Sequence, residues 1–231
     1  MSLQLFGLLF SGLLFSSYTW KVLIALWADD TPFDFRMLGP DHPENGDELR
    51  RRWPFGQFPL LVDDDRSVAE ATCIIEHLQA HHPGPNRWIP DGELGRRVRF
   101  LDRVFDLRVM ANMQAVVFDE LRPAEHRNPA DRSIARERLH TAYDWLEANL
   151  YQSPWAIGEQ FTLADCAAAP SLFYADWVEE IDEKHLQLKA YRARLLAHPV
   201  VARAVDEARA YRPFFPLGAP DRDGGQKESV R

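Results

Sequence analysis

Short apolar runs alternate with helically patterned segments over the first third of the chain. A short apolar run favours a buried strand, whereas apolar residues at every third or fourth position favour a helix. The order strand, helix, strand, short helix, strand, strand, helix predicts a thioredoxin-like α/β unit. The expected elements are strands over 5–11, 33–37, 59–62 and 67–68, helices over 18–28 and 70–80, a loop over 12–15, a loop with a short helix over 42–52 and a hairpin turn over 63–66.

Proline and glycine gather after this unit, at 83–86 and at 90–92, and favour a linker. Beyond them, apolar residues keep helical spacing over 98–117 and 135–150, and further helices are expected over 163–177, 185–197 and 200–211. We therefore predict a two-domain chain of class α/β plus all-α. Its expected parts are a thioredoxin-like domain over 1–82, a linker over 83–95, a helical bundle domain over 96–217 and a polar, disordered tail over 218–231.

The chain is acidic, with 27 basic against 35 acidic residues and a net charge of -8. That balance argues against nucleic acid or an anionic membrane as a partner, although a helix N-terminus can still bind a small anion. The apolar segment 3–15 lacks preceding basic residues and a clear cleavage site, so it does not match a signal peptide. It is also too short to span a bilayer. We expect a cytoplasmic protein with no nucleic-acid or membrane partner.

The cysteine and histidine residues predict no metal site. Cys73 and Cys166 fall within apolar helical patterns and are expected to be small buried side chains. Neither has a second cysteine or histidine at ligand spacing, so we find no zinc motif. His81 and His82 are adjacent rather than four residues apart and precede Pro83, so we expect them at a solvated helix end.

The segment 53–62 places the step Phe58-Pro59 at the entrance of a short apolar strand, and Glu70 opens a helix soon after. Together these features resemble the glutathione-binding half of cytosolic glutathione transferases, and the resemblance extends over roughly residues 4 to 211. It implies a cis Phe58-Pro59 bond, with the Phe58 backbone paired to the cysteinyl part of glutathione. Gln57 stands where many members have lysine or glutamine, and is expected to reach the glycyl carboxylate.

Glu70 by itself suits the first turn of a helix, where acids are favourable. In the family that the chain resembles, an acid followed by serine binds the γ-glutamyl end of glutathione. The acid takes the ammonium group, while the serine and helix N–H groups take the α-carboxylate. Here Ala71 replaces that serine, and Thr72 is the candidate to supply the hydroxyl one residue later. The backbone N–H donors remain in either case.

The segment 12–22 lies where the first strand leads into the first helix, and it resembles the serine-type signature of theta- and zeta-class transferases and their bacterial relatives. The resemblance makes Ser16 the residue that places its hydroxyl beside the glutathione sulfur. A hydroxyl donor and the positive end of a helix favour the thiolate and lower the thiol pKa. Ser16 or Ser17 could instead only cap the helix, and Ser17, Tyr18 and Thr19 remain alternative donors.

Thr162, followed three residues later by Asp165, predicts a capping box at the start of an apolar helix. With Gly158 before it, this pattern resembles the buried sixth helix of the same transferases. We interpret it as a stability element of the helical domain.

The family resemblance implies a transferase that conjugates glutathione, its co-substrate, to a hydrophobic electrophile, a detoxification chemistry. Glutathione-dependent isomerisation, peroxide reduction and dehalogenation are alternatives on the same fold. A non-catalytic glutathione-fold protein that binds ligands or partner proteins is another, which Ala71 keeps open. Apolar residues that could face the electrophile are Met110, Met113, Phe118, Tyr174 and Trp177, although core positions are the commoner role for such side chains.

Such transferases are usually two-fold dimers, so the resemblance also implies a homodimer. The first long helix carries the basic run Arg96, Arg97, Arg99 and Arg103, which could meet acidic groups of a second copy across a two-fold axis. The alternative is that this run is only a solvated helix face.

Overall fold

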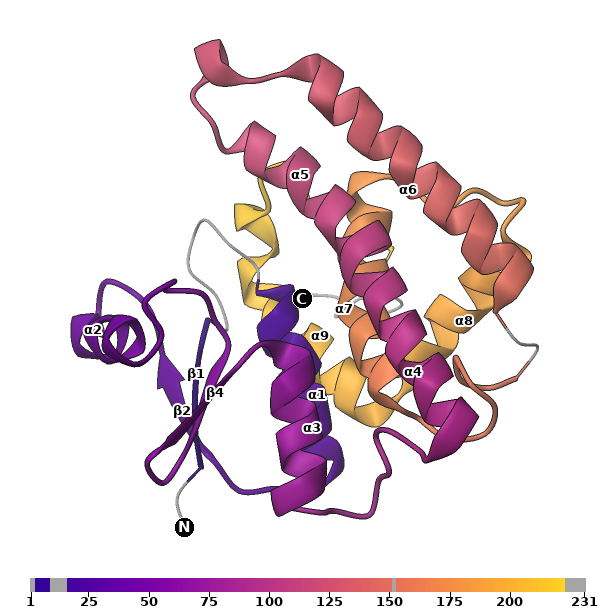
Figure 1. The fold of residues 1–231 in the computed structure, drawn as a ribbon. Coiled ribbons are helices and arrows are strands. Elements are labelled where there is room, and N and C mark those ends of the chain that lie inside the picture. Colours follow the sequence, from indigo (N-terminus) through magenta and orange to yellow (C-terminus); the bar gives the residue numbers. More distant parts are fainter. Residues whose placement is uncertain (1–2, 9–15, 151–152, 223–231) are drawn as a thin grey trace, which may run out of the picture.

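Two units lie side by side in the computed structural model, which describes residues 3–8, 16–150 and 153–222 (Figure 1). The first contains a four-stranded sheet of order β2-β1-β3-β4. β1 (Leu3–Gly7) runs parallel to β2 (Asp34–Met37) and antiparallel to β3 (Leu60–Asp63), which forms a hairpin with β4 (Arg66–Ala69). This mixed sheet confirms the predicted thioredoxin-like class.

Helices cover both faces of the sheet. Because successive side chains of a strand point to opposite faces, Leu5 and Phe6 of β1 belong to different apolar clusters. Leu5 packs beneath α1 (Ser17–Ala28) and α3 (Ala71–His81), and Phe6 packs beneath α2 (Pro43–Arg52). Figure 1 shows α2 on one side of the strands and α1 and α3 on the other.

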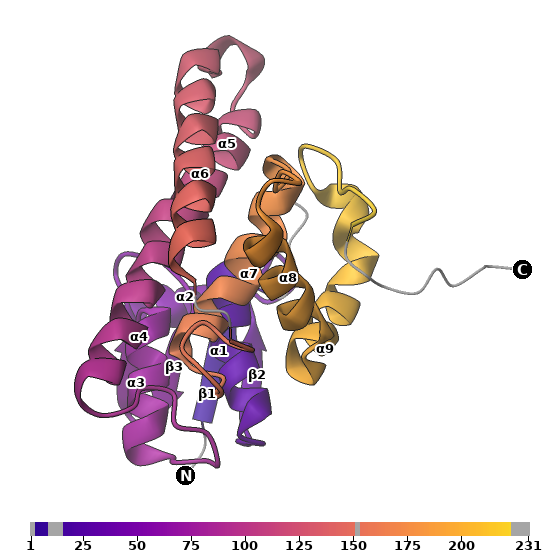
Figure 2. The ribbon, with the colours of Figure 1, turned by 90° about the vertical axis from the view of Figure 1, so that its right-hand side faces the viewer.

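The second unit is built from helices, and α4 (Gly92–Val104) continues without a break through the π-helical segment η1 (Phe105–Met110) into α5 (Ala111–Glu120). Single π-helical turns inside α-helices are frequent at functional sites. Figures 1 and 2 show α5 and α6 extending together beyond the rest of the unit. The remaining helices are η2 (Ala124–His126), α6 (Pro129–Asn149), α7 (Leu163–Val178), α8 (Leu186–Ala197), α9 (Pro199–Ala208) and η3 (Arg209–Phe214).

α7 lies at the centre of the helical unit, and all 16 of its residues are buried. The predicted capping box is present, with the Asp165 carboxylate accepting a hydrogen bond from the Thr162 N–H at 2.8 Å. The same carboxylate accepts the Ala156 N–H at 2.8 Å and the Tyr191 hydroxyl at 2.7 Å. Asp165 therefore holds together the start of α7, the loop before it and α8.

The two units meet along α1 and α7. The Trp20 ring of α1 lies 5.2 Å from that of Phe173 and 5.3 Å from that of Tyr174, measured between centroids. The connecting segment is fixed by Asp29, whose carboxylate accepts a hydrogen bond from the Trp88 indole N–H at 2.8 Å. These contacts pack the sheet-containing unit and the connecting segment against the helical unit.

The first strand differs in part from the expectation, and so does the start of the predicted disordered tail, where Arg222 donates a hydrogen bond to the Asp176 carbonyl at 2.7 Å. β1 spans Leu3–Gly7 rather than 5–11, because an uninterrupted apolar run contains no local signal for its own ends. The rest of that predicted strand from residue 9 onward and the predicted loop over 12–15 lie outside the described residues, as do residues 223–231 of the predicted tail.

Of the two cysteine predictions, one is confirmed and the other is wrong. Cys166 is buried as predicted, but Cys73 is exposed, because α3 buries the neighbouring stripe through Ala71, Ile74 and Leu78 instead. Within the described residues, no helix is long and apolar enough to cross a membrane.

Candidate functional site

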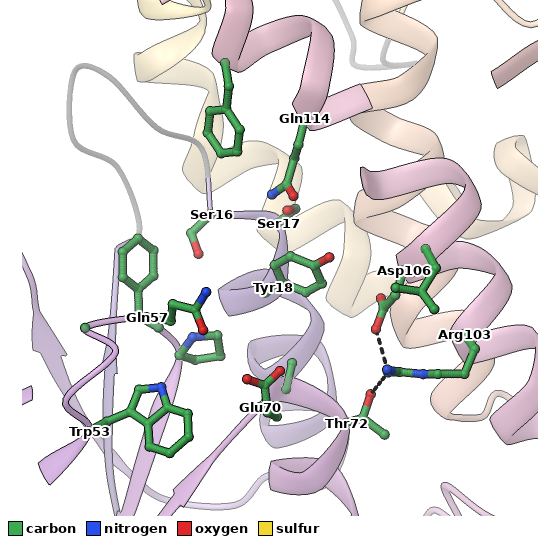
Figure 3. A pocket seen from close by; sticks show the side chains of 16 residues that line it. Ser16, Ser17, Tyr18, Trp53, Gln57, Glu70, Thr72, Arg103, Asp106 and Gln114 are labelled. Atoms are coloured by element: carbon green, nitrogen blue, oxygen red, sulfur yellow. Dashed lines mark hydrogen bonds and ion pairs between the residues drawn. The ribbon is translucent and has the colours of Figure 1, made fainter. Parts of the chain in front are cut away.

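A cavity of about 500 Å³ lies between the two units (Figure 3). One wall is formed by the start of α1, the loop before β3 and the start of α3; the other is formed by α4, η1 and α5. The first wall contains Ser16, Ser17, Tyr18, Trp53, Gly56, Gln57, Phe58, Pro59, Glu70, Ala71 and Thr72, and the second contains Arg103, Asp106, Leu107, Gln114 and Phe118. All the residues that the sequence assigned to glutathione therefore line one cavity.

The loop before β3 presents its backbone to this cavity. The Phe58-Pro59 bond is cis, as predicted, and β3 begins at the next residue. Gly56 has a φ of +65°, a conformation that glycine adopts readily. Figure 3 shows the Gln57 side chain extending into the hollow toward Ser16. This loop can therefore offer backbone groups and a side-chain amide to one ligand.

Ser16 caps α1 and also lines the cavity. Its Oγ accepts a hydrogen bond from the Thr19 N–H at 3.2 Å and lies 2.5 Å from Thr19 Oγ1, with either hydroxyl able to be the donor. When Thr19 donates, Ser16 still has its own proton to give to a ligand. Capping and donation are thus compatible roles for this one hydroxyl.

The neighbouring hydroxyl groups differ in their availability. Ser17 Oγ is buried and has no hydrogen-bond partner among the described residues, so it is a second donor facing the cavity. Burial, followed by the nearby Asp106 carboxylate, raises the pKa of the Tyr18 phenol far above its usual range. Tyr18 therefore keeps its proton at neutral pH and remains an alternative hydrogen-bond donor. Thr19 is fully buried and is not among the lining residues.

Glu70 stands at the N-cap of α3 in a strained backbone conformation, with a φ of +68°. Its carboxylate lines the cavity, and no described residue forms an ion pair with it. Because this exposed carboxylate has no cationic partner among the described residues, it is suited to an ammonium group of a ligand. At the same point, the first N–H groups of α3 have no acceptor within the helix, so they can bind an anion.

Thr72 lines the cavity, but its hydroxyl is already engaged. It donates to Asp102 Oδ2 at 2.9 Å and accepts from Lys21 Nζ at 3.0 Å and from Arg103 Nη2 at 2.7 Å. Because a hydroxyl has one proton, Thr72 can donate to a ligand only by releasing Asp102. The expectation that Thr72 replaces the serine missing at Ala71 is therefore not supported by this arrangement.

A buried network of charges lies behind the Thr72 side of the cavity. Lys21 Nζ, with a side chain 1% exposed, lies 2.5 Å from Asp102 Oδ1 and 2.8 Å from Asp106 Oδ2. Arg103 Nη2 contacts both carboxylates at 2.8 Å. Burial raises the pKa of Asp106, and the Lys21 charge opposes that rise. Two cations thus face two anions, and the network fixes Arg103 beside the cavity (Figure 3).

Sequence reasoning assigned no ligand role to most of the second wall. Arg103, Leu107, Gln114 and Phe118 follow one another at spacings of four, seven and four residues, which put them on one side of a helix. These four positions lie beside the apolar stripe of the helix. Their mixed polarity is the signal that could have identified them as lining residues. Arg103 was instead grouped with a possible dimer surface.

The acceptor candidates need correction. Phe118 lines the cavity and is 45% exposed, in agreement with the expectation. Met110, Met113, Tyr174 and Trp177 are buried in the core of the helical unit and are not lining residues. They lie on the helix faces that pack against neighbouring helices rather than on the edge facing Ser16.

Away from the cavity, three possible metal ligands converge. Asp63, His77 and His82 place one ligand atom each within 4.8 Å of one another. The expectation of a solvated His82 is wrong, because His82 Nε2 lies 2.8 Å from Asp63 Oδ2. The sequence prediction named His81 and His82 but not His77, which lies one turn before His81 on the same helix.

Comparisons with known proteins assign both units. A family model for the glutathione S-transferase N-terminal domain matches residues 10–86, and one for the C-terminal domain of the same family matches residues 97–194. A stringent starvation protein A homolog from Pasteurella multocida is 26% identical over 180 residues, covering 77% of this chain and 80% of that protein. The glutathione S-transferase GstB from Escherichia coli is 23% identical over 189 residues, covering 80% and 91%.

A similar fold is found among solved structures. The glutathione S-transferase from Methylobacillus flagellatus, solved with glutathione bound, superposes with a TM-score of 0.73 at 21% sequence identity. The match covers 88% of this chain and 98% of the solved one.

Proposed function

The chain belongs to the glutathione S-transferase family, and we propose that it binds glutathione in the cavity between its units and joins the glutathione sulfur to a hydrophobic electrophile. The observation that supports this most is convergence. Ser16, the cis Phe58-Pro59 segment and Glu70 come from three separate stretches of chain and line the same cavity.

In the proposed complex, each end of glutathione meets complementary groups. Glu70 takes the γ-glutamyl ammonium group, and the first N–H groups of α3, helped by the charge of Arg103, take the α-carboxylate. The backbone of Phe58 pairs with the cysteinyl part, and Gln57 reaches the glycyl carboxylate. The sulfur then lies beside Ser16.

The chemical step needs a thiolate. A free thiol has a pKa of about 8.5, so only a few per cent is ionised at neutral pH. Ser16 donates its proton in a hydrogen bond to the sulfur, and the N-terminus of α1 adds a favourable field. The thiol proton leaves to solvent, and the thiolate forms a bond to carbon. In a substitution that carbon releases a leaving group with its electron pair, and in an addition the neighbouring atom that receives the electron pair takes up a proton. Leu107 and Phe118 would contact the electrophile.

The second candidate is a glutathione-fold protein that binds ligands or partner proteins without turnover. Two observations favour it: Ala71 lacks the hydroxyl, and the Thr72 hydroxyl is occupied by Asp102. Glutathione-dependent isomerisation, peroxide reduction and dehalogenation are further variants of the catalytic reading.

Retention on immobilised glutathione, followed by conjugation of a chlorinated aromatic compound, separates these functions. The proposal predicts both retention and turnover. Retention without turnover, across a panel of electrophiles that includes peroxides and haloacids, would favour the binding protein. Failure of the wild-type chain to be retained would contradict glutathione binding itself.

We also propose a homodimer, with the exposed apolar ring of Phe100 rather than the arginine run as the surface that meets the second copy. Arg96, Arg99 and Arg103 are each paired with acids of their own chain, so they offer little free charge to a second copy. Phe100 is 44% exposed, and its ring centroid lies 5.7 Å from that of Trp145 in a groove between α4 and α6. Light scattering that gives twice 26.6 kDa would support the dimer, and 26.6 kDa would exclude it.

A further inference from the structure

The Asp63, His77 and His82 trio lies at the opposite end of its elements from the cavity. β3 begins at Leu60, next to Pro59, and ends at Asp63; α3 begins beside Glu70 and ends at His81. His77 lies on the last turns of α3, and His82 is the C-cap residue. The trio therefore joins the far end of the sheet to the far end of the helix, and glutathione binding does not use it.

The geometry of the three side chains is convergent. His77 Nε2 lies 2.9 Å and His82 Nε2 lies 2.8 Å from the same oxygen, Asp63 Oδ2. The side chains are 8%, 19% and 15% exposed for His77, His82 and Asp63, so they are shielded while a solvent path remains. Three ligand atoms this close together can coordinate one ion and leave a further position for water.

We propose that Asp63, His77 and His82 bind a divalent transition-metal ion of the zinc type. Two nitrogen ligands and one carboxylate suit zinc, and they exclude calcium and magnesium, which prefer oxygen ligands. Zinc needs ligand atoms about 2.0–2.2 Å from the metal, which requires only small side-chain movements from the present arrangement. Water completes the fourth position on the open side.

The charge and protonation of the trio also fit a cation. Asp63 contributes a carboxylate, and its Oδ2 already faces the Nε2 atoms of both rings. Within the described residues, each ring makes its side-chain hydrogen bond through Nε2, so the ring proton can reside on Nδ1 when Nε2 binds a metal. Asp64 and Asp65 follow in the hairpin turn and add negative charge nearby.

A bound ion would connect β3 to the end of α3 and stabilise the sheet-containing unit. An ion that binds only the folded chain raises its stability in proportion to the logarithm of its concentration. The site would have no part in conjugation, so its effects should appear in stability and not in turnover.

The test is a calorimetric titration of zinc chloride into the full-length chain, without an affinity tag and after removal of metals with a chelator. We expect saturable binding of one zinc ion per chain. His77→Gln and His82→Gln should each weaken that binding by at least about tenfold, because a lost ligand costs no less than a lost supporting group. His81→Gln is the matched control. His81 is exposed and contributes no ligand atom to the trio, but its ring centroid lies 4.4 Å from that of His77, so this variant removes a neighbouring ring without removing a ligand.

Two further readouts guard against misfolded variants. The melting temperature without metal should be similar in His82→Gln and His81→Gln. A zinc concentration that raises it in the wild type and in His81→Gln should raise it less in His82→Gln. Cobalt(II) bound to the wild type should show the visible absorption of a tetrahedral ion. Absence of saturable zinc binding in the wild type, or equal weakening in all three variants, would overturn the proposal.

Discussion

Lys21 Nζ lies 2.5 Å from Asp102 Oδ1, and this contact joins α1 of the sheet-containing unit to α4 of the helical unit. Both side chains are 1% exposed. Lys21→Met would leave the buried Asp102 and Asp106 with Arg103 as their one cationic partner among the described residues. We expect the free energy of unfolding to fall by about 3–5 kcal/mol, as it does when one partner of a buried pair is removed.

Denaturant unfolding measures this change. Arg99→Met is the control, since Arg99 and Glu76 form an exposed pair whose loss should cost about 1 kcal/mol or less. Adding Asp102→Asn to Lys21→Met should recover part of the loss. If the free energy of unfolding of Lys21→Met equals that of the wild type, the buried network does not hold the units together.

The free energy of unfolding should depend on pH because of His198. It lies between α8 and α9 with its ring stacked on that of Phe161, and burial lowers the pKa of His198 from its usual 6.5. The folded chain then binds this proton less readily than the unfolded chain, so stability is lost as the pH falls below about 6.5. In His198→Phe that loss is absent.

The melting temperatures of His198→Phe and the wild type should therefore diverge, in favour of the variant, between about pH 7.5 and pH 5.5. His126→Phe serves as the control, because His126 is exposed. Parallel curves for His198→Phe and the wild type would refute the assignment.

Ala71→Ser tests the proposed position of the glutathione α-carboxylate. Ala71 lines the cavity at the start of α3, so the added hydroxyl should donate to that carboxylate. Calorimetry should show glutathione binding tightened by about three- to tenfold, as one added hydrogen bond of about 1 kcal/mol gives. Ala80→Ser, exposed on the same helix, should have no effect. Unchanged or weaker binding in Ala71→Ser would place the carboxylate elsewhere.

Arg103→Gln tests the charge on the helical wall. Its guanidinium lines the cavity, so we expect glutathione to bind about tenfold more weakly without it, consistent with the loss of a charge-assisted hydrogen bond. Arg99→Gln removes the same charge from an exposed position of the same helix and should leave binding unchanged. If both variants bind glutathione equally well, Arg103 has only a structural role.

Most of the fold follows from the spacing of apolar residues along short stretches of the chain. The stripe through Val98, Leu101, Phe105 and Val109 is fully buried, as its spacing predicted. β1 shows the limit of such patterns. Its ends depend on pairing with both β2 and β3, and pairing between distant segments leaves no mark in an apolar run.

Site residues that belong to a local motif could be predicted from the sequence. Contacts that depend on how distant helices pack could not. The motifs around Ser16, Phe58-Pro59 and Glu70 lie within single stretches of sequence. The occupation of the Thr72 hydroxyl depends on how α1 and α3 pack against α4, over separations of 51 residues to Lys21 and 30 to Asp102. The convergence of Asp63 with His77 and His82 likewise depends on where α3 ends relative to β3.

Ser16→Ala should lower conjugation turnover by about ten- to a hundredfold, because one preorganised donor to the thiolate is lost. Glutathione affinity should change little, since the proposed anchoring groups lie elsewhere. Losing the cap should also lower stability by about 1 kcal/mol, so the assay is run well below the melting temperature. A comparable loss in Ser17→Ala, with Ser16→Ala unaffected, would move the donor by one residue.

Thiolate activation itself is measured most directly by titrating bound glutathione and following the ultraviolet absorbance of the thiolate against pH. In the wild type, the bound thiol should ionise well below the free value of about 8.5. In Ser16→Ala, its pKa should move back toward that value, while Ser17→Ala should resemble the wild type. A bound thiol that titrates like free glutathione in the wild type, or one that Ser16→Ala leaves unchanged, would contradict the proposed mechanism.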